Sequence, residues 1–342
     1  MASLRSRLAL ALIKKKLPAI VAADPVADLG DGLHVAIVGS GSPLPDKKRG
    51  NPCVAVIAGG KVYIVDTGEQ SSETLNTMGI DAGRIEAVLL THFHSDHIGG
   101  LGSVNLQRWV AEGTDSRLRV FGPPGVERVV NGFNEAYTLD CEYRTAHHGE
   151  VFVNPANGAM VAEQFPVPAD GQSDVVLEDD GLVVTAFEVD HSPVAPVVGF
   201  RFDYQGRSAV ISADTIYSEN LVTASKDTDL LVHDALSIEL LMMVSEASTA
   251  AGLNARGQIL ADVTDYHATA PQAADAAEKS GAKALAITHI VPPLPLKGLE
   301  EVFLADAPDR FDGPLWLASD GDLYSLPAGG GLKRSNLIGR RR

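Results

Sequence analysis

One run of ten residues constrains this chain more than any other feature of its sequence. Residues 91–100 read Thr-His-Phe-His-Ser-Asp-His-Ile-Gly-Gly, so three histidines and an aspartate fall within six positions. An apolar segment of strand length, residues 85–90, comes directly before the run, and two glycines relieve crowding where the chain turns. The motif therefore lies at the end of a predicted strand.

Imidazole and carboxylate groups together suit zinc or a similar divalent ion. The alternating spacing divides the four side chains between two ions, with His92 and His94 on one ion and Asp96 and His97 on the other. A single ion could not easily use all four. The alternative is that the histidines only cap the strand and contact water, but neither a stable core nor a solvated loop requires so many ligand groups so close together.

The composition is that of an ordinary globular protein. Of the 342 residues, 45% are hydrophobic and 21% are charged, which is typical of a chain with a large core. The net charge of −16 argues against a generic nucleic-acid binder, because phosphate contacts need clustered lysine and arginine, although it is compatible with a local basic patch. The two cysteines, Cys53 and Cys141, lie in unlike contexts, which predicts buried thiols and neither a disulfide framework nor a structural zinc site.

Four apolar runs in the second half of the chain each end in polar residues. The runs are residues 182–189, 209–212, 230–232 and 284–287, and they end in Asp190-His191-Ser192, Ala213-Asp214-Thr215, His233-Asp234 and Thr288-His289. Polar residues at strand ends converge on one edge of a sheet, and the repetition favours a shared site over isolated structural histidines. We expect His191 to complete the shell of the first ion and His289 that of the second. Asp214 is the natural bridge, because a carboxylate can bind two cations roughly 3.5–4 Å apart.

The order of these side chains matches a known ligand set: His92, His94, Asp96, His97, His191, Asp214 and His289. With these side chains in this order, the chain resembles the metallo-β-lactamase superfamily over residues 33–325. The resemblance implies an α/β fold, an αββα sandwich with a binuclear metal site at one edge of the sheets. It also implies two divalent ions, zinc in first place and Mn²⁺ or Fe²⁺ as alternatives. With Asp214 in place of a cysteine, the chain is similar to the phosphodiesterase and arylsulfatase branches and not to the cysteine-ligated β-lactamases.

Finer details resemble ribonuclease Z and its bacterial arylsulfatase-like relatives. The matching segments are Gly-Phe-Arg at 199–201, Val-His-Asp-Ala at 232–235, Tyr-His-Ala-Thr at 266–269 and Thr-His-Ile at 288–290. By that similarity, His267 corresponds to the catalytic histidine of the family that does not bind metal.

The mechanism follows from charge. Two cations bound to one water lower its pKa toward neutrality and give a bridging hydroxide that attacks phosphorus, sulfur or a carbonyl carbon. The ions do not supply a proton to the leaving alkoxide, so His267 is the candidate general acid, oriented by Asp234 or another carboxylate. The alternative for His267 is a structural role at the start of a predicted helix over residues 269–279. We assign catalytic roles to His267, Asp234 and Asp96.

One departure from the family concerns the substrate. Ribonuclease Z enzymes insert a flexible arm that grips transfer RNA between the strand after the equivalent of His191 and the strand before the bridging aspartate. Here residues 200–207 pass directly into residues 208–214 as a tight hairpin. With the acidic net charge, this predicts a small-molecule ester as the substrate and argues against transfer RNA as a partner.

The sequence therefore favours a binuclear hydrolase in which the bridging hydroxide cleaves a small phosphodiester or sulfate ester. The first alternative is a ribonuclease Z-type endonuclease that processes the 3′ end of transfer RNA. The second is a lactone or β-lactam hydrolase. A binding module without catalysis is disfavoured, because such relatives lose ligands and this chain retains seven.

Two segments before the motif have open interpretations. The run Gly-Ser-Gly-Ser-Pro at residues 39–43 lacks the Lys-Ser or Lys-Thr of a phosphate-binding P-loop, and we expect a turn beside the site. Asp66 ends a predicted strand and can orient a metal-bound imidazole or cap a helix over residues 69–79. Between the halves of the chain, His147 and His148 line the substrate pocket or lie on the surface.

The termini set the predicted domain boundaries. Residues 1–32 are a leader in which Lys14, Lys15 and Lys16 divide two apolar runs, so no span crosses a bilayer and no secretory signal is present. An amphipathic helix that contacts a membrane surface or a partner is the alternative for this leader. Residues 33–330 form the hydrolase domain and residues 331–342 a basic tail. We expect a cytoplasmic homodimer, with peripheral membrane attachment or export as alternatives.

Overall fold

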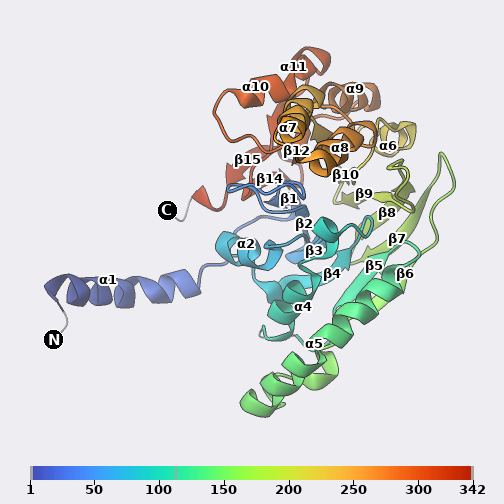
Figure 1. Ribbon diagram of the computed structural model, residues 1–342. Coiled ribbons are helices and arrows are strands. Elements are labelled where there is room, and N and C mark those ends of the chain that lie inside the picture. The colour runs from blue at the N-terminus through green and yellow to red at the C-terminus, as the bar shows by residue number, and fades with distance from the viewer. Residues whose placement is uncertain (1–2, 112–113, 340–342) are drawn as a thin grey trace.

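The computed structural model describes residues 3–111 and 114–339 and consists of two packed sheets with helices on their outer faces (Figure 1). The first sheet contains β1 (Gly32–Gly39), β2 (Cys53–Ala58), β3 (Lys61–Val65), β4 (Ile85–Leu89), β5 (Arg119–Gly122), β6 (Val161–Gln164), β14 (Asp322–Pro327) and β15 (Lys333–Asn336). Its strands follow the order β15-β14-β1-β2-β3-β4-β5-β6. β1 therefore pairs with a strand from the far end of the chain, and Ala36 lies opposite Leu323 in this antiparallel pair.

The second sheet is built from the later part of the chain. It contains β7 (Ser173–Asp179), β8 (Leu182–Glu188), β9 (Val198–Tyr204), β10 (Arg207–Ile211), β11 (Leu230–Leu236), β12 (Leu285–Val291) and β13 (Leu315–Leu317). The order is β13-β12-β11-β10-β9-β8-β7. Strands β10, β11, β12 and β13 run parallel, so their carboxyl ends point to the same edge.

Helices other than α1 lie on the outer faces of the sheets (Figure 1). The longer helices are α1 (Leu4–Val21), α2 (Ser71–Met78), α4 (Leu101–Trp109), α5 (Val126–His148), α7 (Ile238–Ala250), α8 (Asn254–Asp262) and α9 (Ala270–Ser280). The shorter ones are α3 (Ser95–Ile98), α6 (Glu219–Ala224), α10 (Leu299–Leu304) and α11 (Ala307–Arg310), with 3₁₀ turns η1 (Ala82–Arg84), η2 (Pro155–Asn157) and η3 (Val263–Asp265). Met78, Leu101 and Val126 of α2, α4 and α5 pack on the first sheet, and the alanines of α9 pack on Leu231 and Leu285 of the second.

The main core lies between the two sheets. Side chains that point inward from alternating strand positions fill it, among them Val56 and Tyr63 from the first sheet and Phe200 and Phe202 from the second. These aromatic side chains are almost completely buried, so apolar contact holds the two sheets together through this core. The αββα sandwich predicted from the sequence is confirmed.

The connection between β9 and β10 is a tight hairpin. Tyr204 pairs with Arg207, and the two turn residues Gln205 and Gly206 have φ values of 50° and 71°. Positive φ at both central positions of a two-residue turn matches the twist of the flanking strands. The connection is as short as the sequence predicts.

Helix α1 projects away from the two sheets at the N-terminal end (Figure 1). All of its side chains are exposed, including Leu8, which is 72% exposed. Contact with the body begins after the helix, where Val26 is buried and Asp24 pairs with Arg84. Among residues 3–111 and 114–339, no helix is long and apolar enough to cross a membrane. The predicted boundary at residue 32 stays a prediction.

The segment predicted as a basic tail contains a strand. β15 carries Lys333 and Arg334 and pairs antiparallel with β14, and Arg334 forms an ion pair with Asp322 at 2.8 Å. Leu337 is buried after it. The final residues of that predicted tail, 340–342, lie outside the described residues.

Because α1 has no buried surface to lose, deletion of residues 1–21 should change the free energy of unfolding by less than about 1 kcal/mol in a urea titration. A chain that ends at residue 331 is the matched control. It loses the pairing of β15 with β14 and the burial of Leu337, and we expect a clear loss of stability. If deletion of residues 1–21 destabilised the protein more than the C-terminal truncation, α1 would have to pack on the body in solution.

Candidate metal centre

The ligand-rich run is fixed by backbone contacts at the end of β4. His94 precedes the single turn α3, which brings Asp96 and His97 to one side. The chain then returns beside the end of β3, where the Gly100 amide donates to the carbonyl of Thr67 at 2.7 Å. A Cβ at Gly100 would lie 2.2 Å from the carbonyl oxygen of Gly68. The second glycine of the motif is therefore required by this close approach of two backbones.

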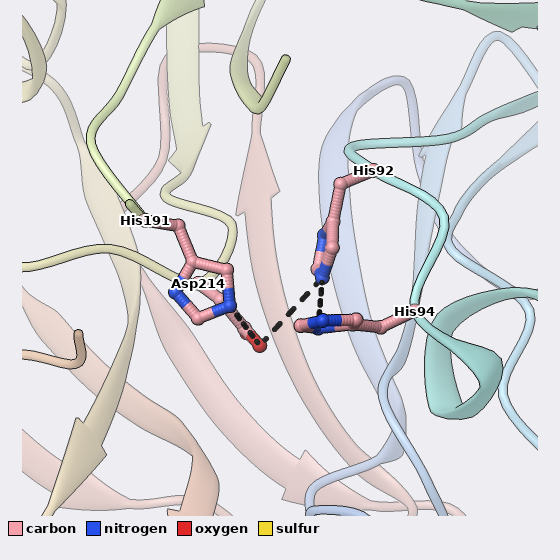
Figure 2. Close-up of side chains that lie close together, drawn as sticks. All are labelled: His92, His94, His191 and Asp214. Carbon is pink, nitrogen blue, oxygen red and sulfur yellow. Dashed lines mark hydrogen bonds and ion pairs between the residues drawn. The ribbon is translucent and has the colours of Figure 1, made fainter. Parts of the chain in front are cut away.

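A first group of ligand atoms contains His92, His94, His191 and Asp214, and these atoms lie within 4.8 Å of one another. His92 Nε2 and His94 Nδ1 are 3.0 Å apart. Asp214 Oδ2 is 3.9 Å from His92 Nε2 and 3.9 Å from His191 Nε2. Figure 2 shows the rings of His92 and His94 on one side and His191 with Asp214 on the other, all directed at a common point.

A second group contains Asp96, His97 and His289, again within 4.8 Å. The Nε2 atoms of His97 and His289 are each 3.5 Å from Asp96 Oδ2 and 3.2 Å from Asp214 Oδ2. One oxygen of Asp214 therefore lies between the two groups. The seven side chains that the sequence predicts as ligands are brought together in the two groups that it predicts.

Asp66 orients His97 from behind. Its Oδ2 accepts a hydrogen bond from His97 Nδ1 at 2.8 Å, and its two oxygens accept from the amide and hydroxyl of Thr91 at 2.9 and 2.8 Å. This leaves Nε2 of His97 directed at the centre. Helix α2 begins at Ser71 after Gln70, whose side chain makes no capping bond. Of the two roles open for Asp66, the contact with the imidazole is the one present.

His191 and His92 are oriented in a similar way. His191 Nδ1 donates to the carbonyl oxygen of Tyr266 at 2.7 Å, and His92 Nδ1 lies 3.0 Å from Thr91 Oγ1. In each case the remaining ring nitrogen faces the centre. Tyr266 was not singled out in the sequence. It contributes a backbone carbonyl and a ring that lies 4.6 Å from the ring of His191. Because every residue has a backbone carbonyl, the sequence gives no signal for that contact.

The electrostatics of the centre suit cations. Burial lowers the pKa of His92, His94 and His191 below the ordinary imidazole value, so these rings are neutral at pH 7 and able to bind metal. Burial opposes ionisation of Asp214, but His289 and His97 hold the pKa of this carboxyl well below its usual range.

Several buried polar atoms of the centre have no hydrogen-bond partner within residues 3–111 and 114–339: Asp96 Oδ2, His97 Nε2, His191 Nε2 and His289 Nε2. Leaving such atoms unsatisfied is costly. Their donor chemistry, nitrogen with carboxylate oxygen, is that of zinc and similar ions. The residues present therefore fit a pair of divalent ions.

His267 lies beside the centre and is paired with Asp234. Its Nδ1 donates to Asp234 Oδ2 at 2.9 Å, and Asp234 Oδ1 lies 3.0 Å from Nδ1 of His233. Burial works against the charge of Asp234, but hydrogen bonds from His233 and His267 lower its pKa. Helix α9 is capped by Thr269 and Gln272 in a capping box, so His267 has no capping role. A third group of ligand atoms joins His267 to Asp214 and His289.

The paired histidines His147 and His148 take no part in these groups. They end helix α5 with their rings 4.7 Å apart and are exposed. Cys53 is buried, as the sequence predicts, and burial raises the pKa of its thiol to about 12. Cys141 is only partly buried.

Comparison with known proteins finds relatives in sequence and in fold. The model of the metallo-beta-lactamase superfamily matches residues 47–289. Ribonuclease Z of Mycobacterium avium (strain 104) is 36% identical over 290 residues, which cover 84% of this chain and 96% of that protein. Human tRNase Z, short form, superposes with a TM-score of 0.62 at 21% identity, over 86% of this chain and 99% of that one. A diphosphatase of the PhnP family gives a TM-score of 0.57 at 21% identity, over 85% and 97%.

These relatives contradict the expected partner. The short hairpin and the net charge of −16 predicted a small-molecule ester and argued against transfer RNA, but the similarity to ribonuclease Z runs through 96% of that relative. The prediction was wrong because a net charge sums over the whole surface, whereas phosphates respond to the charges near them. A missing arm likewise removes one contact region and leaves the centre unchanged.

Asp214 is expected to hold both ions, because its Oδ2 lies between the two groups. The variant Asp214→Asn replaces a charged oxygen with an amide and should lose at least one of two bound ions, measured as metal per chain after desalting. His147→Ala removes an exposed histidine at the end of α5 and should keep the metal content of the unchanged protein. Equal metal content in the two variants would contradict the bridging role.

His267→Ala should lower turnover by about 10²–10⁴-fold with the metal content nearly unchanged, because it removes a proton donor and no ligand. Asp234→Asn should lower turnover as well, since it removes the carboxylate that fixes the ring. His148→Ala is the control. A His267→Ala protein that lost its ions along with its activity would make His267 a ligand through the third group.

Proposed function

The chain belongs to the metallo-beta-lactamase superfamily of hydrolases, and from that premise we propose that it is a ribonuclease Z-type endonuclease that processes the 3′ end of precursor transfer RNA. The relatives named ribonuclease Z support this reading over the small phosphodiester or sulfate ester that the sequence placed first. The observation that carries the proposal is the centre itself, where two ligand groups share one oxygen of Asp214 beside the Asp234–His267 pair.

The metal we propose is zinc, held as a pair by the two groups. When bound, two such ions lower the pKa of a shared water toward neutrality and offset the negative charge of the reacting phosphate. The seven side chains hold the ions in place, and Asp66 and the Tyr266 carbonyl keep His97 and His191 turned toward them.

The leaving oxygen needs a proton, and we assign its donation to His267. Asp234 accepts the hydrogen bond from Nδ1, so Nε2 is the atom that can carry the proton to the substrate. The lowered pKa of Asp234 keeps it ionised at neutral pH, and its charge stabilises the protonated ring. In this assignment His267 supplies the proton and Asp234 orients its ring.

A pocket beside Asp96 supports a phosphate-bearing substrate. It has a volume of about 290 Å³ and is lined by Arg49 and Asn51 among others. The Arg49 side chain is only 9% exposed, and its Nη1 forms an ion pair with Asp46 Oδ2 at 3.6 Å. A guanidinium held at a pocket wall is suited to bind phosphate oxygens.

The same loop adds two exposed cations near the site. Lys47 and Lys48 precede Arg49 and are exposed. Lys47 and Lys48 can attract a phosphate backbone to this edge of the pocket, although Asp46, Glu69 and Asp96 also line it and the chain as a whole has a net charge of −16. Sequence reasoning placed a turn at residues 39–43 beside the site but gave no role to the run of three cations at residues 47–49, which was the signal for this part of the loop.

The decisive experiment is cleavage of a precursor transfer RNA with a 3′ trailer by the zinc-loaded protein at low salt. We expect a cut at the 3′ side of the acceptor stem, and cleavage should weaken steeply as salt rises, because phosphate contacts release counterions. Asp214→Asn is the inactive control. Parallel assays use p-nitrophenyl sulfate and a lactone. Rapid hydrolysis of either, with the precursor left intact, would refute the proposal.

A further inference from the structure

We propose that Asp320 is a positioning residue that clamps the loop of residues 40–51 beside the metal centre, and that the clamped loop sets how tightly the RNA substrate binds. The nature of the substrate rests on the proposed function. The clamp itself rests only on contacts between Asp320 and the loop.

Asp320 lies between β13 and β14, in the last part of the chain. Its Oδ1 accepts hydrogen bonds from the amide and the hydroxyl of Ser40 at 2.9 and 2.7 Å. Its Oδ2 accepts from the amide of Gly50 at 2.7 Å. One carboxylate therefore joins the two ends of a loop that lies 270 to 280 residues earlier in the sequence.

The loop is narrow at the place where Asp320 binds it. The Gly41 amide donates to the carbonyl of Gly50 at 2.8 Å, and Asn51 Nδ2 donates to the carbonyl of Ser42 at 3.3 Å. A Cβ at Gly41 would lie 2.9 Å from the Gly50 oxygen, so the two sides approach closely only because this residue is glycine. A carboxylate at this neck controls the position of everything beyond it.

The clamp connects to the centre by two routes. The carbonyl of Ser40 accepts a hydrogen bond at 3.0 Å from the amide of Ile290, the residue after the ligand His289. Beyond the neck, Arg49 lines the pocket that Asp96 borders. Loss of the clamp would therefore release the pocket wall and loosen the backbone next to His289.

The position of Asp320 is favourable only because of its contacts with the loop. It is half-buried, and burial raises the pKa of its carboxyl, although the hydrogen bonds from Gly50 and Ser40 act in the opposite direction. A carboxylate that gained nothing there would be unfavourable. Its three donors all come from one loop, so the contacts that offset burial are the contacts that hold the loop.

Asp322 provides a matched control two residues away. It is a buried aspartate at the start of β14, and its carboxylate accepts from Ser319, Arg334 and Asn336. These partners belong to β15 and to its own turn. Asp322→Ala therefore removes a buried carboxylate of the same size without touching residues 40–51.

The first test is limited trypsin digestion of the metal-loaded protein, because Lys47, Lys48 and Arg49 are cleavage sites inside the loop. We expect cleavage at these residues to be about tenfold faster or more in Asp320→Ala, since the loop opens when its buried hydrogen bonds are lost. Asp322→Ala should be cut there at the rate of the unchanged protein. Equal rates in the two variants would overturn the clamp.

The second test is kinetic. In Asp320→Ala the KM for precursor transfer RNA should rise by about tenfold or more, with a smaller change in kcat and with both ions retained, because binding at the loop weakens while the ligands remain. Asp320→Asn keeps an acceptor for Ser40 and presents an amide to Gly50. Its KM should therefore lie between the KM of the unchanged protein and that of Asp320→Ala. An unchanged KM in Asp320→Ala would refute the effect on substrate.

A folding failure of Asp320→Ala and a failure of the proposed function can be told apart from a failure of the clamp. If Asp320→Ala failed to fold, Asp320→Asn would take its place in both tests, with Asp322→Asn as the control. If the unchanged protein left precursor transfer RNA intact, the proposed function would fail, and the trypsin comparison would still decide for or against the clamp.

Discussion

The carboxylate of Asp214 is the group on which the rest of the site depends. It follows β10 of the second sheet, and its Oδ2 lies 3.2–3.9 Å from ring nitrogens that follow β4 of the first sheet and from the His289 ring of β12. Removing these polar groups from water is unfavourable, and the attraction between this buried anion and the surrounding rings offsets that desolvation free energy. The sheets are thus joined by charge at this edge and by apolar packing elsewhere.

Three hydrogen-bond acceptors behind the histidines orient the rings around that centre. Asp66, the carbonyl of Tyr266 and Asp234 each accept a hydrogen bond from one histidine Nδ1. Three rings that could rotate are thereby held with Nε2 toward the reaction. The positions of the three rings differ: His97 and His191 face the shared oxygen of Asp214, whereas His267 lies beside the centre and is paired with Asp234.

The sequence revealed much of the centre because of where its residues lie. His191, Asp214 and His289 each come at the end of an apolar run, and parallel strands bring such ends to one edge, so alternation and strand length were enough to group them. The same reasoning could not find the Tyr266 carbonyl, which every residue type shares. It could not find the contact between Asp320 and Ser40 either, because nothing local marks an approach across 280 residues. It misjudged the partner because a net charge carries no information about position.

The pairing of β1 with β14 has a consequence for how the protein is made. During synthesis, β1 emerges long before its partner on that side, β14, and before the carboxylate of Asp320. Until then the sheet has an open edge and the loop beside the centre lacks its anchor. Assembly of the centre and its loop is thus tied to synthesis of β14 and Asp320, and a fragment that ends before residue 320 lacks both.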